Sequence, residues 1–192
     1  DHAEVTMQSK ASGNESVGIE GHYHVVCRDA AGNLKWEESF LNLVNAVGKQ
    51  LMLDTFLSGS AYTTVGPFLG LISGASPTFA AADTMVTHAG WTEFVNYTVG
   101  GSAVRGTASF SSATSTGTTP TNVTTKAATV ITYTITGAGG TVGGCFLVTG
   151  TGAVSTQNNT SGTLYSAGAF ATAKVTTVGD TVSVTYSTTA TS

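Results

Sequence analysis

The chain has 192 residues, enough to bury one sizeable hydrophobic core, and we expect a single compact domain. Only 9% of the residues are charged, compared with about a quarter in ordinary soluble domains, and the formal net charge is -4. The few basic residues never cluster, which argues against direct nucleic-acid binding, and no apolar run reaches the roughly 18 residues of a membrane helix. We therefore expect a protein made in the cytoplasm, with neither a membrane nor a nucleic acid as partner.

Residues 1–20 predict an extended N-terminal arm. They mix charged side chains with serine and glycine, a composition that supplies little to a core. Such arms often become ordered only when they bind a partner. The remaining residues, 21–192, are expected to form one domain.

Residues 22–28 and 33–40 alternate well enough to predict two strands. The segment between them, from Asp29 to Asn33, has the glycine and the small polar residues that favour tight turns. A β-hairpin is the expected structure.

One helix is predicted, at about residues 42–57. Asn42 or Ser39 is suited to cap its start, and Gly59 lies beyond its end. Gly48 inside this segment weakens the helical pattern. The apolar residues near helical spacing are Leu43, Val44, Val47, Leu51 and Phe56 or Leu57.

The rest of the chain predicts strands. The run at 68–73 (FLGLIS) is apolar throughout and fits a buried strand. Threonine-rich runs separated by glycine follow, and their apolar residues alternate most clearly at Ile131, Tyr133 and Ile135 and at Val182, Val184 and Tyr186. The predicted fold is mainly β: a β-sandwich, of jelly-roll or immunoglobulin-like type, with one short helix and the N-terminal arm. The further runs are at 104–110, 125–136, 143–150, 163–170 and 180–189.

Threonine favours strands and gives them a neutral exposed face. After Arg105, the only charged side chains are Lys126, Lys174 and Asp180. Strand edges with so little charge tend to associate with other chains, so we expect them to be covered by copies of this chain or by a larger assembly.

The sequence predicts no catalytic, cofactor-binding or metal-binding residue. His22 and His24 are two residues apart in a strand and face the same way, as two metal ligands do, but no further ligand pattern accompanies them. Asp83 and His88 have no nucleophile motif nearby. Solvent-facing histidines and a structural hydrogen bond of His88 to a loop carbonyl are the simpler interpretations.

Cys27 and Cys145 are interpreted as two buried, reduced thiols, with a single disulfide as the alternative. The glycine pairs match neither a dinucleotide-binding nor a phosphate-binding loop, so we interpret them as turns. These pairs are Gly100-Gly101, Gly139-Gly140 and Gly143-Gly144.

Four aromatic residues are candidates for a partner-binding or sugar-stacking surface, because aromatic rings are common anchors of both. Core packing is expected to account for most of them, and Trp91 in particular is expected in the core. The four are Trp36, Trp91, Tyr97 and Tyr165.

Five segments of the chain together resemble one family of proteins: 42–57, 66–100, 143–150, 162–170 and 178–187. The most recognisable block comprises Phe68-Leu69-Gly70-Leu71-Ile72, Asp83-Thr84, His88-Ala89-Gly90-Trp91, Glu93 and Tyr97. In these residues the chain is similar to tailed-phage virion proteins whose genes lie near that of the major capsid protein. The resemblance covers about residues 40–188.

This resemblance implies a head cement or decoration protein without enzymatic activity. Such a protein has a β-rich body on the outer surface of the phage head, where it stabilises contacts between subunits of the major capsid protein. Self-association as a dimer or trimer is expected as well. The block is interpreted as a folding and packing signature, and the contacts with the partner are expected in the arm 1–20 and in the loops.

Two other functions compete with this one. A tail-fibre or receptor-binding module would share the composition, although the repetitive segments of a fibre shaft are missing. An enzyme such as a glycan hydrolase would need two carboxylates roughly 5 to 10 Å apart in a cleft. The carboxylates late in the chain are Asp83, Glu93 and Asp180.

Overall fold

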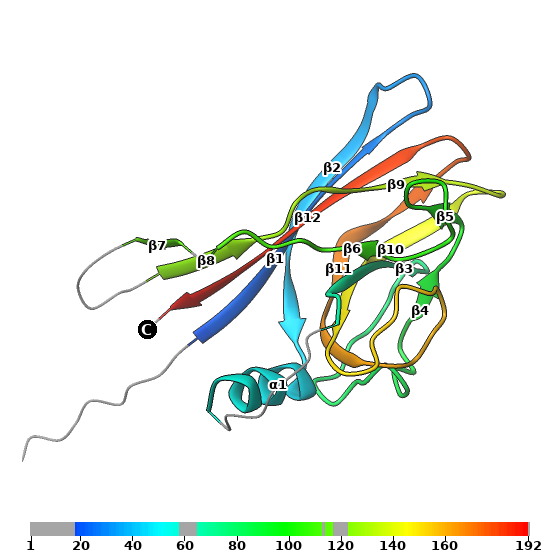
Figure 1. Cartoon of the computed structure of the whole chain (residues 1–192). Helices are drawn as coiled ribbons and strands as arrows, with labels where there is room; N and C mark the ends of the chain where they lie inside the picture. The colour runs from blue at the N-terminus through cyan, green and yellow to red at the C-terminus, as the bar shows by residue number, and fades with distance from the viewer. Residues whose placement is uncertain (1–17, 58–64, 113, 117–122, 192) are drawn as a thin grey trace, which may run out of the picture.

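The computed structural model describes residues 18–57, 65–112, 114–116 and 123–191. Over these residues the fold is mainly β, with one helix (Figure 1). The elements are β1 (Gly18–Arg28), β2 (Leu34–Val44), α1 (Ala46–Leu57), β3 (Phe68–Ser73), β4 (Thr92–Phe94), β5 (Tyr97–Thr98), β6 (Gly106–Thr107), β7 (Thr114–Thr116), β8 (Val123–Ala127), β9 (Ile131–Ile135), β10 (Gly140–Thr149), β11 (Thr163–Thr176) and β12 (Thr181–Thr191).

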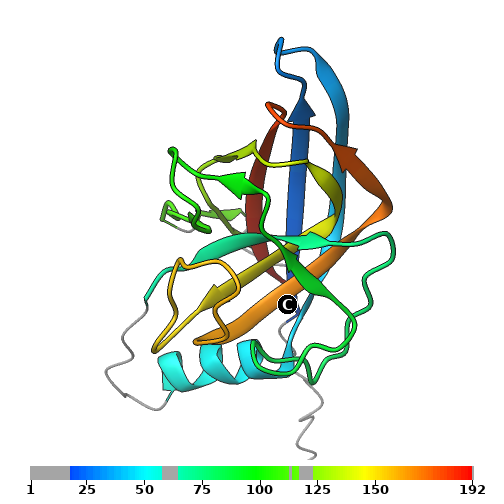
Figure 2. The same ribbon diagram turned by 90° about the vertical axis from the view of Figure 1, so that its right-hand side faces the viewer.

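The described strands form one antiparallel sheet in the order β4-β3-β10-β11-β2-β1-β12-β8-β7. β9 pairs with β12 and β5, and β6 pairs with β3. Strand β2 joins the two halves, because it pairs with β1 along most of its length and with β11 through Leu43 and Val44. The sheet curls into a nearly closed, barrel-like body (Figure 2). The Tyr133 hydroxyl helps to bring its ends together by donating a hydrogen bond of 2.7 Å to the carbonyl of Leu69.

The main core lies inside this curved sheet. Alternation in β9 and β12 places every second residue there, as the sequence predicts. Tyr133, Val182, Val184 and Tyr186 are all fully buried. From β1, the same alternation adds Tyr23, Val25 and Cys27.

A second, smaller core lies on the outer side of β3, β10 and β11. The loops at residues 74–91 and 150–162 contribute Met85, Trp91 and Ala153 to it. Strand β10 is therefore buried on both faces, which is why its residues show no alternation in burial. The sheet contributes Ile72, Phe146, Val148, Leu164 and Ala167 to this core.

The β1–β2 hairpin confirms the predicted one, but β1 begins earlier than expected. Residues 18–20 were predicted to belong to the N-terminal arm, whereas they pair with Thr189–Thr191 of β12. This correction depends on a partner strand from the far end of the chain, which local sequence does not reveal. The rest of the predicted arm, residues 1–17, lies outside the described residues.

The predicted helix is confirmed, but its start at residue 42 is wrong. Asn42, Leu43 and Val44 belong to β2, because the ladders with β1 and β11 extend that strand to its last residue. Helix α1 begins at Ala46. Asn45 precedes it, and its side-chain amide donates to the carbonyls of Ala80 and Asp83, which fixes the loop 74–91 against the start of the helix.

Gly48 has a packing role in α1. A β-carbon at this position would lie 2.4 Å from the carbonyl oxygen of Tyr165. Glycine therefore lets the helix approach the backbone of β11 more closely than any other residue would.

The predicted strand at 68–73 matches β3, and the run at 163–170 falls within β11. The runs at 143–150 and 180–189 match β10 and β12 except for one end residue each, since Gly150 follows β10 and Asp180 precedes β12. The run at 125–136 is two strands, β8 and β9, and the run at 104–110 contains only the short β6. The sheet is continuous through β2, so the jelly-roll or immunoglobulin-like type stays a prediction.

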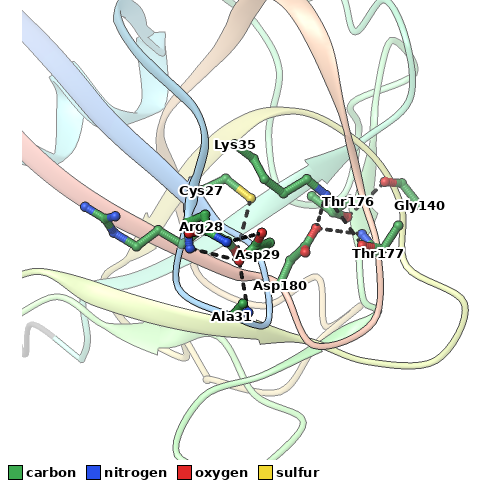
Figure 3. A network of polar contacts seen from close by, with 10 residues as sticks. Cys27, Arg28, Asp29, Ala31, Lys35, Gly140, Thr176, Thr177 and Asp180 are labelled. Carbon is green, nitrogen blue, oxygen red and sulfur yellow. Dashed lines mark hydrogen bonds and ion pairs between the residues drawn. The ribbon is translucent and has the colours of Figure 1, made fainter.

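Two turns at one end of the body are tied together by a buried carboxylate (Figure 3). Asp180 follows the β11–β12 turn, and its Oδ2 accepts hydrogen bonds from the Lys35 Nζ at 2.6 Å and from the Thr177 backbone N–H at 2.8 Å. Burial of the Asp180 carboxyl opposes its ionisation, but these hydrogen bonds outweigh burial and lower its pKa. The same bond raises the pKa of Lys35.

This ion pair should make stability depend on pH. Because folding lowers the pKa of Asp180 and raises that of Lys35, the pair stabilises the fold between about pH 4 and about pH 10, the pKa values of the unfolded chain. Its contribution is lost as the pH falls through the folded pKa of Asp180. We expect Asp180→Asn to lower the free energy of unfolding by about 2 kcal/mol at pH 7.

Urea denaturation of both proteins at pH 7 and at pH 3 measures this effect. The difference between the two proteins should shrink at pH 3. An equal loss at both pH values would contradict the assigned role of the charge.

Candidate functional site

The recognisable block of the sequence surrounds a buried ion pair. The side chains of Arg105 and Glu93 are 1% and 5% exposed. Arg105 Nη2 lies 2.7 Å from Glu93 Oε2, and Arg105 Nε donates to Oε1 at 2.9 Å. Burial of both partners would be unfavourable without this bidentate geometry and further hydrogen bonds.

Further contacts of this pair hold the loop 150–162. Arg105 Nη2 donates to the carbonyl of Asn159 at 2.7 Å, and the Asn158 backbone N–H donates to Glu93 Oε2 at 2.7 Å. The guanidinium also lies over the ring of Phe146, 5.1 Å from its centroid. Both oxygens of Glu93 thus already accept hydrogen bonds, which gives this carboxylate a structural role.

Asp83 and His88 have separate structural contacts. Asp83 Oδ2 accepts a hydrogen bond from the Ala80 backbone N–H at 3.0 Å. The His88 ring stacks on Trp91 at 3.9 Å, and its Nδ1 lies 3.0 Å from the Trp91 carbonyl oxygen. The predicted hydrogen bond of His88 to a loop carbonyl is therefore present. Asp180, the remaining carboxylate in the second half of the chain, binds Lys35 beside the β11–β12 turn.

His22 and His24 lie on the same, outer side of β1, as their spacing predicts. His24 Nε2 is 2.8 Å from Glu37 Oε1 on the neighbouring strand β2. Within the described residues, no group of three histidine, cysteine or acidic side chains is placed to hold a metal ion.

Cys27 and Cys145 are buried, free thiols, which agrees with the favoured prediction and excludes the disulfide between them. Burial raises the pKa of Cys27 to about 11, with a smaller contribution from Asp180. Burial also raises the pKa of Cys145. Both groups are therefore protonated and unreactive at neutral pH.

The four candidate aromatic residues have different environments. Trp91 is in the outer core, as expected, and Tyr97 is in the main core. Trp36 is half-buried and packs edge-to-face on Phe170. Tyr165 is half-buried and lines a pocket. Trp91 also lines two pockets, so of these two residues Tyr165 is distinguished only by being the less buried.

The outer side of β12 and β9 forms a surface that we call the hydroxyl face. Its side chains alternate with the core residues of the same strands, and the register places Thr132 beside Ser183 and Thr134 beside Thr181. The Thr132 and Ser183 hydroxyl oxygens are 3.1 Å apart. The hydroxyl face consists of Thr132, Thr134, Thr181, Ser183, Thr185, Ser187 and Thr189, and none of these side chains is charged.

On the opposite side of β12, an apolar pocket of about 210 Å³ lies beside the helix, and we call it the α1 pocket. Tyr186 and Thr188 of β12 form one wall, and Leu51, Met52 and Thr55 of α1 form another. The remaining lining residues are Pro67, Phe110, Leu147, Thr149 and Tyr165.

Neither Arg105 nor Tyr186 was predicted from the sequence as a residue of these sites. A signal for Arg105 exists, because an isolated arginine that precedes a long, nearly uncharged segment is a candidate for a buried ion pair. Tyr186 was predicted only as a core residue. Its place at the pocket depends on where the helix packs, and nothing in the local pattern reveals that.

Comparison with known proteins finds no matching family model, no similar curated sequence and no similar solved structure. In the described part of the chain, no helix has both the length and the apolar character needed to cross a membrane.

We expect Glu93→Gln to lower the free energy of unfolding by about 3 kcal/mol, because it leaves the buried charge of Arg105 without its partner. Urea denaturation measures this loss. Glu37→Gln is the matched control, since Glu37 pairs with His24 at a largely exposed position and should contribute little. Equal losses in the two variants would contradict the role of the buried pair.

Proposed function

We propose that this protein decorates the outside of a tailed-phage head and stabilises contacts between subunits of the major capsid protein. The observation that carries the proposal is the hydroxyl face, a row of neutral hydrogen-bonding side chains across two paired strands. Serine and threonine can be buried at an interface without the large cost of removing charges from water. A hydroxyl is also both donor and acceptor, so it adapts to slightly different neighbours.

The shape of the sheet supports the same function. The start of β1, the end of β12, and β8 and β7 extend beyond the body, away from the outer core (Figure 1). A projecting ribbon adds contact area without enlarging the core. Many modest contacts, repeated over a lattice, would stabilise a particle by multivalency rather than by one tight site.

The resemblance to phage virion proteins is the second support. In its most recognisable block, Trp91 packs in the outer core, His88 stacks on Trp91, and Glu93 pairs with Arg105. These contacts explain why the block would act as a packing signature in this chain. We further propose that the body belongs to the β-sandwich class, of jelly-roll or immunoglobulin-like type, with β3, β10 and β11 facing β1, β12 and β9. Self-association of copies on the head, as dimers or trimers, would cover the sparsely charged strand edges.

The test is co-sedimentation of the purified protein with capsids that lack it. Saturable binding of many copies per particle, with a higher temperature of capsid disruption, is the expected result. Binding of only a few copies at one vertex would instead favour a tail-fibre or receptor-binding module. Absence of binding would contradict the proposal.

A charge on the hydroxyl face should disrupt attachment. We expect Ser183→Glu to weaken capsid binding at least about tenfold, because a carboxylate between Val26 and Thr132 would be buried at the interface without a partner. The matched control is Thr172→Glu, at an exposed position of β11 outside the hydroxyl face. Co-sedimentation over a range of protein concentrations measures both affinities. Equal binding by the two variants would show that the hydroxyl face is not part of the interface with the capsid.

The N-terminal residues can be tested separately. Because β1 begins at Gly18, deletion of residues 1–17 leaves every described strand complete. We expect the truncated protein to keep its thermal unfolding transition and to bind fewer copies per capsid. Full occupancy after deletion would show that these residues are not needed for attachment.

A further inference from the structure

The α1 pocket has a mostly apolar lining that includes two tyrosines, Tyr165 and Tyr186. The Tyr186 hydroxyl is buried without a hydrogen-bond partner, so this residue offers its ring to the pocket. Leu51, Leu147 and Tyr186 are buried side chains that contribute to its walls, and Phe110 adds a half-buried ring. No charged residue is among the described residues that line it. Such a lining favours uncharged ligands, because a charged group would lose its hydration without gaining a partner.

The hydroxyl groups in the pocket differ in how well they are satisfied. Thr55, Thr149 and Thr188 each donate a hydrogen bond to a backbone carbonyl, those of Leu51, Val65 and Glu20. These carbonyls are strong acceptors.

Tyr165 instead donates to the thioether sulfur of Met52, at 3.3 Å. A thioether is a weak acceptor, so an oxygen atom placed in the pocket would be a better partner for this hydroxyl.

We propose that the α1 pocket binds a small, uncharged aromatic molecule that carries one hydrogen-bond acceptor. Its ring packs among Leu51, Phe110, Leu147 and Tyr186, and its oxygen accepts a hydrogen bond from Tyr165 in place of Met52. This site is independent of attachment to a capsid, since the pocket and the hydroxyl face lie on opposite sides of β12.

The volume limits the size of the ligand. A closed apolar cavity of about 150 Å³ is large enough to bind benzene. The α1 pocket, at about 210 Å³, has room for a benzene ring with a short substituent. Acetophenone, whose carbonyl lies beside the ring, has this size and this acceptor.

The test uses a matched pair of probes, acetophenone and cumene, which have the same number of non-hydrogen atoms but differ in the carbonyl. Titrations of the full-length protein followed by NMR measure both affinities. We expect both probes to bind. Tyr165→Phe should weaken acetophenone binding about fivefold and leave cumene binding unchanged, as expected for the loss of one hydrogen bond.

Two further variants locate the site. Thr55→Trp should fill the pocket and abolish binding of both probes, while Thr172→Trp, on exposed β11 surface, should bind as the parent does. Thermal unfolding of each variant checks that it is folded.

Failure of the parent protein to bind either probe would overturn the proposal. An equal effect of Tyr165→Phe on the two probes would exclude the proposed hydrogen bond.

Discussion

The outer core of this protein depends on the buried ion pair between Arg105 and Glu93. A buried pair by itself adds little net stability, because both charges lose their hydration. Here the pair also holds the backbone of the loop 150–162 through Asn158 and Asn159. That loop and the loop 74–91 cover apolar side chains on the outside of β3, β10 and β11. Without the pair, those side chains would lose part of their cover, and β10 would have one face in water.

Much of the fold could be predicted from the sequence, because burial in most strands follows a simple alternation. Tyr133 and Val184 are buried where the period of two places them. The predicted element boundaries are wrong where pairing with a strand from a distant part of the sequence determines the structure. Residues 18–20 are a strand only because the end of β12 pairs with them, and residues 42–44 extend β2 only because β1 and β11 lie beside them. The sheet is continuous because β2 pairs with both β1 and β11, and the local sequence pattern does not reveal this pairing.

The candidate surfaces were predictable to a smaller degree. The composition predicts neutral, threonine-rich strands, but the hydroxyl face also requires the register that brings β9 beside β12. Of the four aromatic candidates, only Trp91 was assigned to the core from the sequence, since the burial of Tyr97 and the exposure of Tyr165 to a pocket depend on tertiary packing. Arg105 was overlooked because its role depends on Glu93 and on the loop 150–162. The isolated position of Arg105 in the sequence indicates a buried ion pair, but it does not identify the partner.

The absence of charge from the hydroxyl face has a consequence for the conditions under which it can work. Attraction between exposed charges weakens as dissolved salt screens it, over a distance of about 8 Å at physiological ionic strength. Hydrogen bonds between neutral hydroxyl groups are not screened in this way, and they do not titrate between acidic and alkaline water. A contact made through this face would therefore depend less on salt concentration and on pH than a contact between charged surfaces.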